Sequence, residues 1–190
     1  GWKIVDSVLT FKTEQILEQD YDYKGNRDIM YGDEEFENFE LYLEWKIPKG
    51  GNSGIYYHIK EGYGGFADMA PEYQLLDDEN YAEIHNYELK DWQLTAADYA
   101  MHVPDTTQKV LYPPGQWNSS RIIFTSNNVE HWLNDKKVLS FIPWTEEWYE
   151  KRNSGKWDNF PDYGKYKKGY IGLQDHGSNL WFRNIKIKKL

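Results

Sequence analysis

The segment from residue 39 to residue 47 constrains the fold of this chain more than any other. Apolar and polar residues alternate strictly along it, in the order Phe39-Glu40-Leu41-Tyr42-Leu43-Glu44-Trp45-Lys46-Ile47. Successive side chains of a β-strand point to opposite faces of its sheet, so this period of two is typical of a strand with one buried face. We therefore predict that Leu41, Leu43 and Trp45 are buried between two sheets and that Glu44 lies outside them.

Short β-type runs recur over the rest of the chain. They cover residues 3–9, 55–59, 72–76, 121–124, 129–133, 137–142, 170–174 and 180–187. Clusters of Gly, Pro, Asn and Asp between them, such as Asn134-Asp135, supply the backbone positions that tight turns need. About ten short strands at this spacing predict an all-β fold, an antiparallel β-sandwich of the concanavalin A-like jelly-roll type.

The segment 145–155 departs from the β pattern. It begins with Thr145, which is a good N-cap, and continues with acidic residues in its first turn and basic residues in its last. Gly155 follows, where helices commonly end. We predict one short helical insertion here.

Composition narrows the classes of function. The chain has 190 residues and shows no step in composition, which predicts a single domain over residues 1–190. A net charge of −9 disfavours binding to nucleic acid, and no run is long enough to span a membrane. The absence of Cys excludes disulfides and a thiol nucleophile. The oligomeric state stays open.

The candidate site lies on an outer sheet face, because polar residues that alternate with core residues must point away from the sandwich interior. The residues predicted to point outward are Glu40, Tyr42, Glu44, Lys46, Tyr56, His58, Glu72 and Gln74. Aromatic rings together with carboxylates and amides suit sugars, which present both C–H faces and hydroxyls. The alternative is that these polar residues are simply solvated.

Two further segments carry polar residues next to predicted strands. Asn52 lies in the glycine-rich segment 50–54, where its amide either contacts a ligand or closes its own loop. Gln174-Asp175-His176-Gly177 is the densest polar cluster, and strand ends often carry function. Alternatively, Asp175 caps a turn and His176 is merely exposed.

Motifs for metal or nucleophilic chemistry are missing from the sequence. The five His residues show no His-x-His or His-Glu-x-x-His spacing, and there is no Gly-x-Ser-x-Gly nucleophile motif. We therefore expect neither a metal nor another cofactor.

Seven segments in one order resemble the 3-keto-disaccharide hydrolase family, formerly a domain of unknown function. They are residues 39–46, 51–58, 71–78, 114–118, 129–134, 169–177 and 181–187. The resemblance covers nearly the whole chain. It implies a concanavalin-like jelly roll, a glycoside hydrolase that acts on sugars oxidised to a ketone at C3, and export to the periplasm or cell surface.

Two positions depart from the family pattern. The segment Thr95-Ala96-Ala97 stands where the family usually has Thr-Gly-Ala, and Asn134-Asp135 stands where its hairpin usually has Asn-Gly. The Ala96 methyl group would either narrow a pocket or oppose a positive φ angle, which would change the substrate range. Asp135 tolerates the backbone of the turn.

A C3 ketone acidifies the hydrogen on C2, so a base can remove it, the C1 substituent can leave by elimination, and water can add back. As catalytic residues we predict Glu72 or His176 as the base, with His58 or Asp175 assisting the leaving group. The predicted substrate-binding residues are Asn52, Gln74, Gln174, Glu44 and Tyr56.

Two other functions fit the same fold. One is an endo-glucanase, although Glu40 and Glu44 would be about 13 Å apart on one strand, too far for paired carboxylates without a third group between them. The other is a non-catalytic carbohydrate-binding module, which gives no reason for the cluster at His176.

Overall fold

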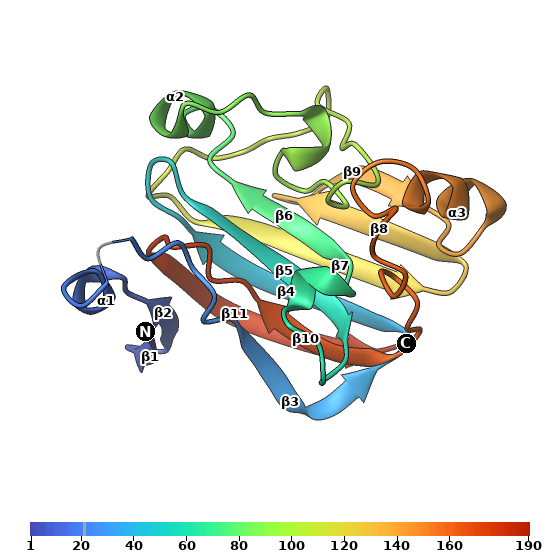
Figure 1. Ribbon diagram of the computed structural model, residues 1–190, viewed down its shortest axis with the longest axis horizontal. Coiled ribbons are helices and arrows are strands. Elements are labelled where there is room, and N and C mark those ends of the chain that lie inside the picture. Colours follow the sequence, from blue (N-terminus) through green and yellow to red (C-terminus); the bar gives the residue numbers. More distant parts are fainter. Residues whose placement is uncertain (21) are drawn as a thin grey trace.

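The computed structural model describes residues 1–20 and 22–190, and it consists of two antiparallel sheets packed face to face (Figure 1). The larger sheet has the strand order β1-β2-β11-β4-β7-β8-β9. Its strands are β1 (Trp2–Val5), β2 (Val8–Phe11), β4 (Phe39–Lys46), β7 (Asn118–Thr125), β8 (Asn128–Leu133), β9 (Lys136–Phe141) and β11 (Leu180–Lys189). The predicted β-sandwich is confirmed.

The smaller sheet has the strand order β3-β10-β5-β6. Its strands are β3 (Ile29–Phe36), β5 (Asn52–Ile59), β6 (Glu72–Leu76) and β10 (Gly169–Leu173). Short helices lie in the connections: α1 (Glu14–Leu17), η1 (Phe66–Asp68), α2 (Tyr81–His85), η2 (Asp91–Gln93) and α3 (Glu146–Arg152). Among the described residues, none of the helices has the length and apolar character needed to cross a membrane.

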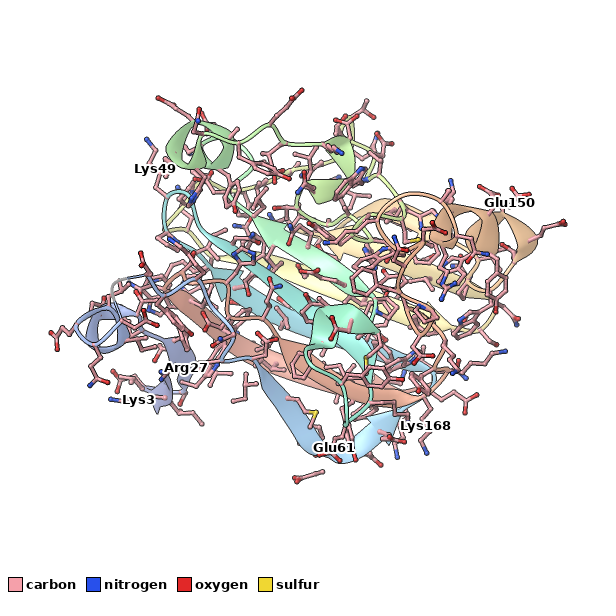
Figure 2. The ribbon with its side chains drawn as sticks, in the orientation of Figure 1. Lys3, Arg27, Lys49, Glu61, Glu150 and Lys168 are labelled. Carbon is pink, nitrogen blue, oxygen red and sulfur yellow. The ribbon has the colours of Figure 1, made fainter. Side chains whose placement is uncertain are left out.

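The core lies between the sheets, as the alternation in β4 predicts. Leu41, Leu43 and Trp45 are 1–2% exposed, whereas Glu44 is only partly buried and lies on the opposite face. The Trp45 indole N–H donates to Ser120 Oγ at 2.8 Å, so its polar group is satisfied inside the core. Figure 2 shows the contrasting periphery, where charged side chains such as Lys49 and Glu150 project outward.

Two parts of the fold differ from the strand predictions. Residues 3–9, predicted as one strand, belong to the hairpin of β1 and β2, which turns at Asp6 (φ 50°) and Ser7 (φ 62°). The sequence pattern also missed β3, an edge strand of the smaller sheet in which Asp33 is exposed and Glu34 and Glu35 are partly exposed. An edge strand with one open side needs no apolar alternation, which explains the missing signal.

The predicted helix and hairpin turn are both present. α3 begins after Thr145, whose hydroxyl accepts a hydrogen bond from the Trp148 backbone N–H at 3.2 Å. Asn134 and Asp135 have φ angles of 46° and 62°, which are the left-handed values that this type of turn requires.

Loops cover the outer face of the smaller sheet. Two loop segments, residues 60–66 and 162–166, are joined where the Tyr63 hydroxyl donates to Asp162 at 2.8 Å. Trp157, from the preceding part of the chain, stacks on Tyr163 of the second segment with ring centroids 3.9 Å apart. This cover makes the outer face of the smaller sheet a sheltered surface, in contrast to the open sheet face that the sequence pattern predicts.

Candidate active site

The site is built on two neighbouring strands of the smaller sheet, β5 and β6. Their register places Glu72 opposite Tyr56 and Gln74 opposite Gly54. Because side chains alternate along a strand, Tyr56, Gly54 and Asn52 share one face with Glu72 and Gln74. The sequence prediction that these residues share an outer face is therefore correct, although Glu72 and Gln74 are only 4% and 3% exposed.

Gly54 makes room for the carboxylate of Glu72. A Cβ atom at Gly54 would lie 2.0 Å from Glu72 Oε1, and 2.7 Å from its Cδ. Such distances are far inside van der Waals contact, so only glycine allows Glu72 to lie flat across β5 at this point. Gly54 thus has a direct role in placing the Glu72 carboxylate.

A short chain of polar groups extends from the carboxylate toward β10. The Gln174 amide donates from Nε2 to the Tyr56 hydroxyl at 2.8 Å, and the Tyr56 hydroxyl in turn interacts with Glu72. Two buried oxygens on the same face, Gln174 Oε1 and Asn52 Oδ1, have no hydrogen-bond partner among the described residues. Buried polar atoms without a partner are rare, and they suit a ligand that supplies donors.

Burial raises the pKa of Glu72 to about 8, because the apolar surroundings disfavour its charged form. The Tyr56 hydroxyl and the Lys156 ammonium act in the opposite direction, while the nearby carboxyl of Asp28 raises the pKa further. A carboxyl group with a pKa near neutrality can both accept and return a proton at physiological pH, as acid–base catalysis requires.

Lys156 and Tyr99 belong to the site but were not predicted from the sequence. Lys156 Nζ lies 4.2 Å from the centroid of the Tyr99 ring, and the Tyr99 backbone N–H donates to the Glu72 carbonyl at 3.0 Å. Burial lowers the pKa of Lys156, while Glu72 acts to raise it. Both residues lie in irregular segments without a sequence pattern, so only the folded chain reveals their proximity.

Two hollows open on opposite edges of this face. One, of about 480 Å³, is lined by residues that include Trp92 and Lys156 and lies beyond β6. The other, of about 350 Å³, includes Asp28 and Phe66 and lies beside β3. Hollows of this size are in the range of small-molecule sites. Glu72 is not among the lining residues of either, but it interacts with Lys156 of the first and with Asp28 of the second.

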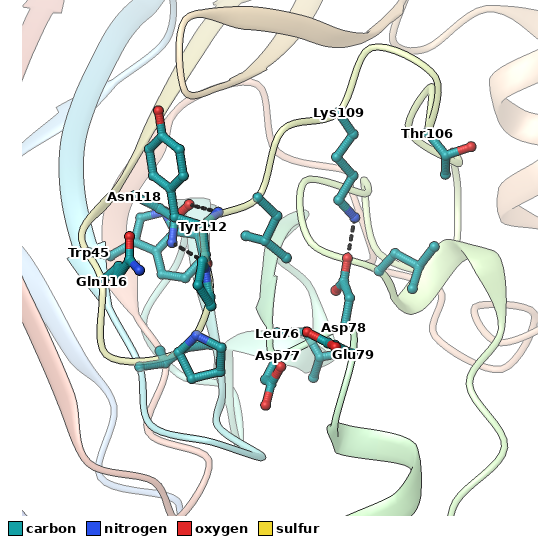
Figure 3. Close-up of a pocket in the computed structure, with 15 residues that line it drawn as sticks. Trp45, Leu76, Asp77, Asp78, Glu79, Thr106, Lys109, Tyr112, Gln116 and Asn118 are labelled. Carbon is teal, nitrogen blue, oxygen red and sulfur yellow. Dashed lines mark hydrogen bonds and ion pairs between the residues drawn. The ribbon is translucent and has the colours of Figure 1, made fainter.

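A third hollow, of about 450 Å³, lies away from this face (Figure 3). It is lined by Trp45, Leu76 and Asn118, among others, and Figure 3 shows the Asp78–Lys109 ion pair across it. Unlike the other two hollows, it has among its described lining residues none of the charged groups that interact with Glu72. We therefore place the candidate active site at Glu72 and not in this hollow.

The cluster at the end of β10 divides into two roles. The His176 side chain is exposed at the surface. Its pKa is lowered, chiefly by partial desolvation from the surrounding protein atoms and also by repulsion from His85 and Lys156. Asp175 is 3% exposed, and its carboxylate accepts hydrogen bonds from the Tyr23 hydroxyl, from the Arg27 backbone N–H at 3.1 Å and from the Gly177 backbone N–H at 2.9 Å. These contacts agree with the alternative interpretation of Asp175, in which its carboxylate caps a turn.

His58 does not join the site, contrary to the prediction that it lies outward with Tyr56. It has φ 58°, so the strand alternation is interrupted there. The ring lies against the core side chains Phe39 and Phe124, with centroids 5.9 and 4.5 Å away, and its Nε2 contacts the Glu37 carbonyl at 2.9 Å. Burial lowers the pKa of His58 to about 4, so it is a neutral core residue.

Glu44 also lies elsewhere, on the outer face of the larger sheet. Its carboxylate accepts hydrogen bonds from Arg183 Nε at 2.6 Å and from Asn184 Nδ2 at 2.7 Å. The prediction that Glu44 binds the same ligand as Glu72 is wrong, because β4 and β6 belong to different sheets whose outer faces point in opposite directions.

Ala96 adopts φ 72°, the conformation that the family's glycine would favour. Its methyl group is fully buried in the core between the sheets. Of the two expected effects of the Ala96 methyl group, the one on the backbone therefore applies: the methyl group disfavours the positive φ angle that Ala96 adopts. It does not narrow the site at Glu72.

Comparison with known proteins gives the family. Residues 1–188 match the family described as the 3-keto-alpha-glucoside-1,2-lyase-like domain. The chain is 35% identical to a 3-keto-disaccharide hydrolase of Bacteroides thetaiotaomicron, over 100% of this chain and 70% of that protein. The chain belongs to this family. The predicted family and the prediction of an enzyme of the glycosyl hydrolase class are both confirmed.

Solved structures of family-like proteins agree with this assignment. A candidate glycosyl hydrolase of Parabacteroides distasonis has 43% identity and a TM-score of 0.87, covering 100% of this chain and 84% of that one. A carbohydrate-binding module of Bacillus subtilis, at 10% identity, has a TM-score of 0.59 over 100% of this chain and 91% of its own. The similarity to the carbohydrate-binding module concerns the fold alone, and it agrees with the predicted jelly roll.

Proposed function

We propose that the protein cleaves glycosides that carry a ketone at C3 of the sugar, at the outer face of the four-stranded sheet. The observation that carries this proposal is Glu72, a buried carboxyl group whose pKa is raised to about 8. Family membership supports the substrate class, because a curated relative is named a 3-keto-disaccharide hydrolase. A single tuned base fits an elimination, whereas hydrolysis through an oxocarbenium ion needs two carboxyl groups flanking one bond.

The reaction starts with ionised Glu72 taking the proton from C2 of the sugar. The electron pair of the C–H bond moves into C2–C3 and places negative charge on the C3 oxygen. When the ketone re-forms, a C1–C2 double bond forms and the bond from C1 to the leaving oxygen breaks. The leaving oxygen takes a proton from His176. Water then adds to C1 as hydroxide and gives its other proton to His176, and Glu72 returns its proton to C2, so the net change is hydrolysis.

Polar groups around Glu72 suit the negative charge that develops on the C3 oxygen. The Tyr56 hydroxyl and the Gln174 amide form a hydrogen-bonded pair beside the carboxylate, and the Lys156 ammonium adds positive charge. Preorganised donors and charges of this kind stabilise enolates in a site sheltered from water. The unpartnered amide oxygens of Gln174 and Asn52 accept hydrogen bonds from sugar hydroxyls.

His176 is the group that assists the leaving oxygen in this proposal. It is exposed at the rim, and Lys156 is close enough to influence the pKa of both His176 and Glu72. Asp175 holds the loop that carries His176, through its hydrogen bonds to Tyr23, Arg27 and Gly177.

The proposal is tested by incubating the protein with matched pairs of glycosides that differ only in a hydroxyl or a ketone at C3. Product release is measured together with binding. We expect release from the keto compounds alone. Release from the plain glycosides would indicate an ordinary glycosidase, and binding of both without release would indicate a carbohydrate-binding module.

A further inference from the structure

The outer face of the larger sheet carries an aromatic and cationic band that the proposed reaction does not use. Its aromatic members are Trp117, Trp132 and Trp181, all partly exposed. Its basic members are Lys12, Lys46, Arg121, Lys137 and Arg183. We call these eight residues the tryptophan band.

The band has two parts on the same sheet face, and in each part a tryptophan ring lies beside cations from neighbouring segments. Lys46 Nζ lies 5.1 Å from the Trp117 ring and 4.8 Å from the Trp181 ring. Arg183 lies 4.0 Å from the Trp117 ring, and Lys12 lies 4.5 Å from the Trp181 ring. Aromatic and basic groups thus alternate in space over β2, β11, β4 and the start of β7.

The other end of the band contains a small hollow. Its volume is about 170 Å³, and it is lined by Tyr42, Ser119, Arg121, Trp132 and Asp135. The Arg121 guanidinium lies 5.7 Å from the Trp132 ring, so one wall combines an aromatic ring with a positive charge. A hollow of this kind can hold one sugar ring with an acidic substituent.

Charge makes this face unlike the rest of the molecule. The chain has a net charge of −9, yet cations outnumber carboxylates on this face, because Lys186 and Lys188 also lie opposite Tyr42 and Glu40 in the register. Part of the charge is balanced, since Arg183 pairs with Glu44 at 2.6 Å, Lys137 pairs with Glu130 at 3.2 Å and Arg121 pairs with Glu40 at 3.7 Å. Lys46 and Lys12 contact aromatic rings, from which a flexible lysine can swing to an incoming anion.

We propose that the tryptophan band binds an acidic polysaccharide, one whose sugars carry carboxylates. The tryptophan rings contact the apolar C–H faces of the sugars, and the basic side chains pair with the carboxylates along the polymer. An extended chain suits a band that crosses several strands. The face opposite Glu72 then holds the enzyme on a polymer while the catalytic face stays free.

The test measures the binding of polygalacturonate by affinity electrophoresis and calorimetry, at low and at high NaCl concentration. We expect the wild-type protein to bind at low salt and to bind more weakly at high salt, because salt screens exposed charges. Trp117→Ala and Trp132→Ala should each weaken binding about tenfold or more, as expected for central aromatic contacts. The double variant Lys12→Ala with Lys46→Ala tests the charges without altering an aromatic ring.

Two controls locate the effect. Lys151→Ala removes a cation of α3 that is not part of the tryptophan band, and Glu72→Gln alters the proposed base on the smaller sheet; both should bind like the wild type. Thermal unfolding confirms that each variant is folded. The proposal is overturned if the wild type does not bind, if the band variants bind normally, or if neutral dextran or a single-stranded oligonucleotide binds as well as polygalacturonate. Because no turnover is measured, these results are independent of the proposed reaction.

Discussion

Glu72 is almost fully buried, in an environment that disfavours its charged form, and its charged neighbours Lys156 and Asp28 each line a hollow. Its place on the outer face follows from strand alternation, and the sequence pattern predicts it. Its raised pKa results from burial under the loops that cover the face and from the nearby carboxyl of Asp28, whereas Tyr56 and Lys156, which come from other segments, oppose the rise. Those influences are tertiary, so residue spacing along β6 carries no information about them.

Titration of Glu72 should control the acid limb of the pH–rate profile. A base must be ionised, so kcat/KM should rise with pH, reach half of its maximum near pH 8, the pKa of Glu72 in the free protein, and level off above it. His176, in contrast, has a pKa lowered from the usual histidine range of about 6.5. A profile that levels off below pH 6.5 would assign the base to the imidazole.

Gly54→Ala should abolish most turnover without unfolding the protein. The new methyl group would lie 2.0 Å from Glu72 Oε1, so the carboxylate must leave its position. We expect a loss of about 10²-fold or more, within the range for general-base catalysis. Gly32→Ala is the matched control, because a Cβ atom there meets nothing within 4 Å. Equal losses in both variants would show that the effect is general and not specific to Glu72.

At the scale of elements, regular alternation predicted more of the structure than any motif. β4 has the predicted burial at every position, and β8 alternates in the same way. β5 follows the pattern only as far as Tyr57, because the positive φ angle at His58 turns that side chain into the core. A bulge of this kind depends on packing against other strands, which explains why the prediction for His58 was wrong while that for Tyr56 was correct.

The N-cap of α3 gives a prediction at this scale. Thr145→Ala removes the hydroxyl that accepts a hydrogen bond from the Trp148 backbone N–H, and it should lower the free energy of unfolding by about 1 kcal/mol. Thr145→Ser keeps the hydroxyl and should cost much less. The measurement is chemical denaturation of both variants. Similar losses would contradict the capping role.

At the scale of the whole molecule, the two sheets divide the polar residues between two opposite outer faces. The sequence pattern identified outward residues on both faces but could not separate them, because strand alternation does not tell which sheet a strand joins. Glu44 and Glu72 were therefore predicted as parts of one site. The sheet order assigns them to different faces, and it leaves the tryptophan band on the face opposite Glu72.

Burial of Glu72 should make stability depend on pH. The folded protein holds the Glu72 proton up to about pH 8, while the unfolded chain releases it near pH 4.5. The stabilising contribution is therefore complete below about pH 4.5 and is lost as pH rises to 8. The free energy of unfolding of Glu72→Gln, taken relative to that of the wild type, should therefore rise by about 3–5 kcal/mol between pH 4.5 and pH 8. Urea denaturation at pH 4.5, 6, 7 and 8.5 measures this gain, and a constant difference would contradict the raised pKa.

The most direct test of the account follows the C2 hydrogen of a 3-keto glycoside in deuterated water. Exchange at C2 is measured by NMR for the wild type, Glu72→Gln and His176→Ala, with each variant confirmed as folded. If Glu72 is the base, Glu72→Gln should slow exchange by about 10²–10⁴-fold, while His176→Ala should still exchange C2 but release the aglycone slowly. Exchange at the wild-type rate in Glu72→Gln would contradict the account.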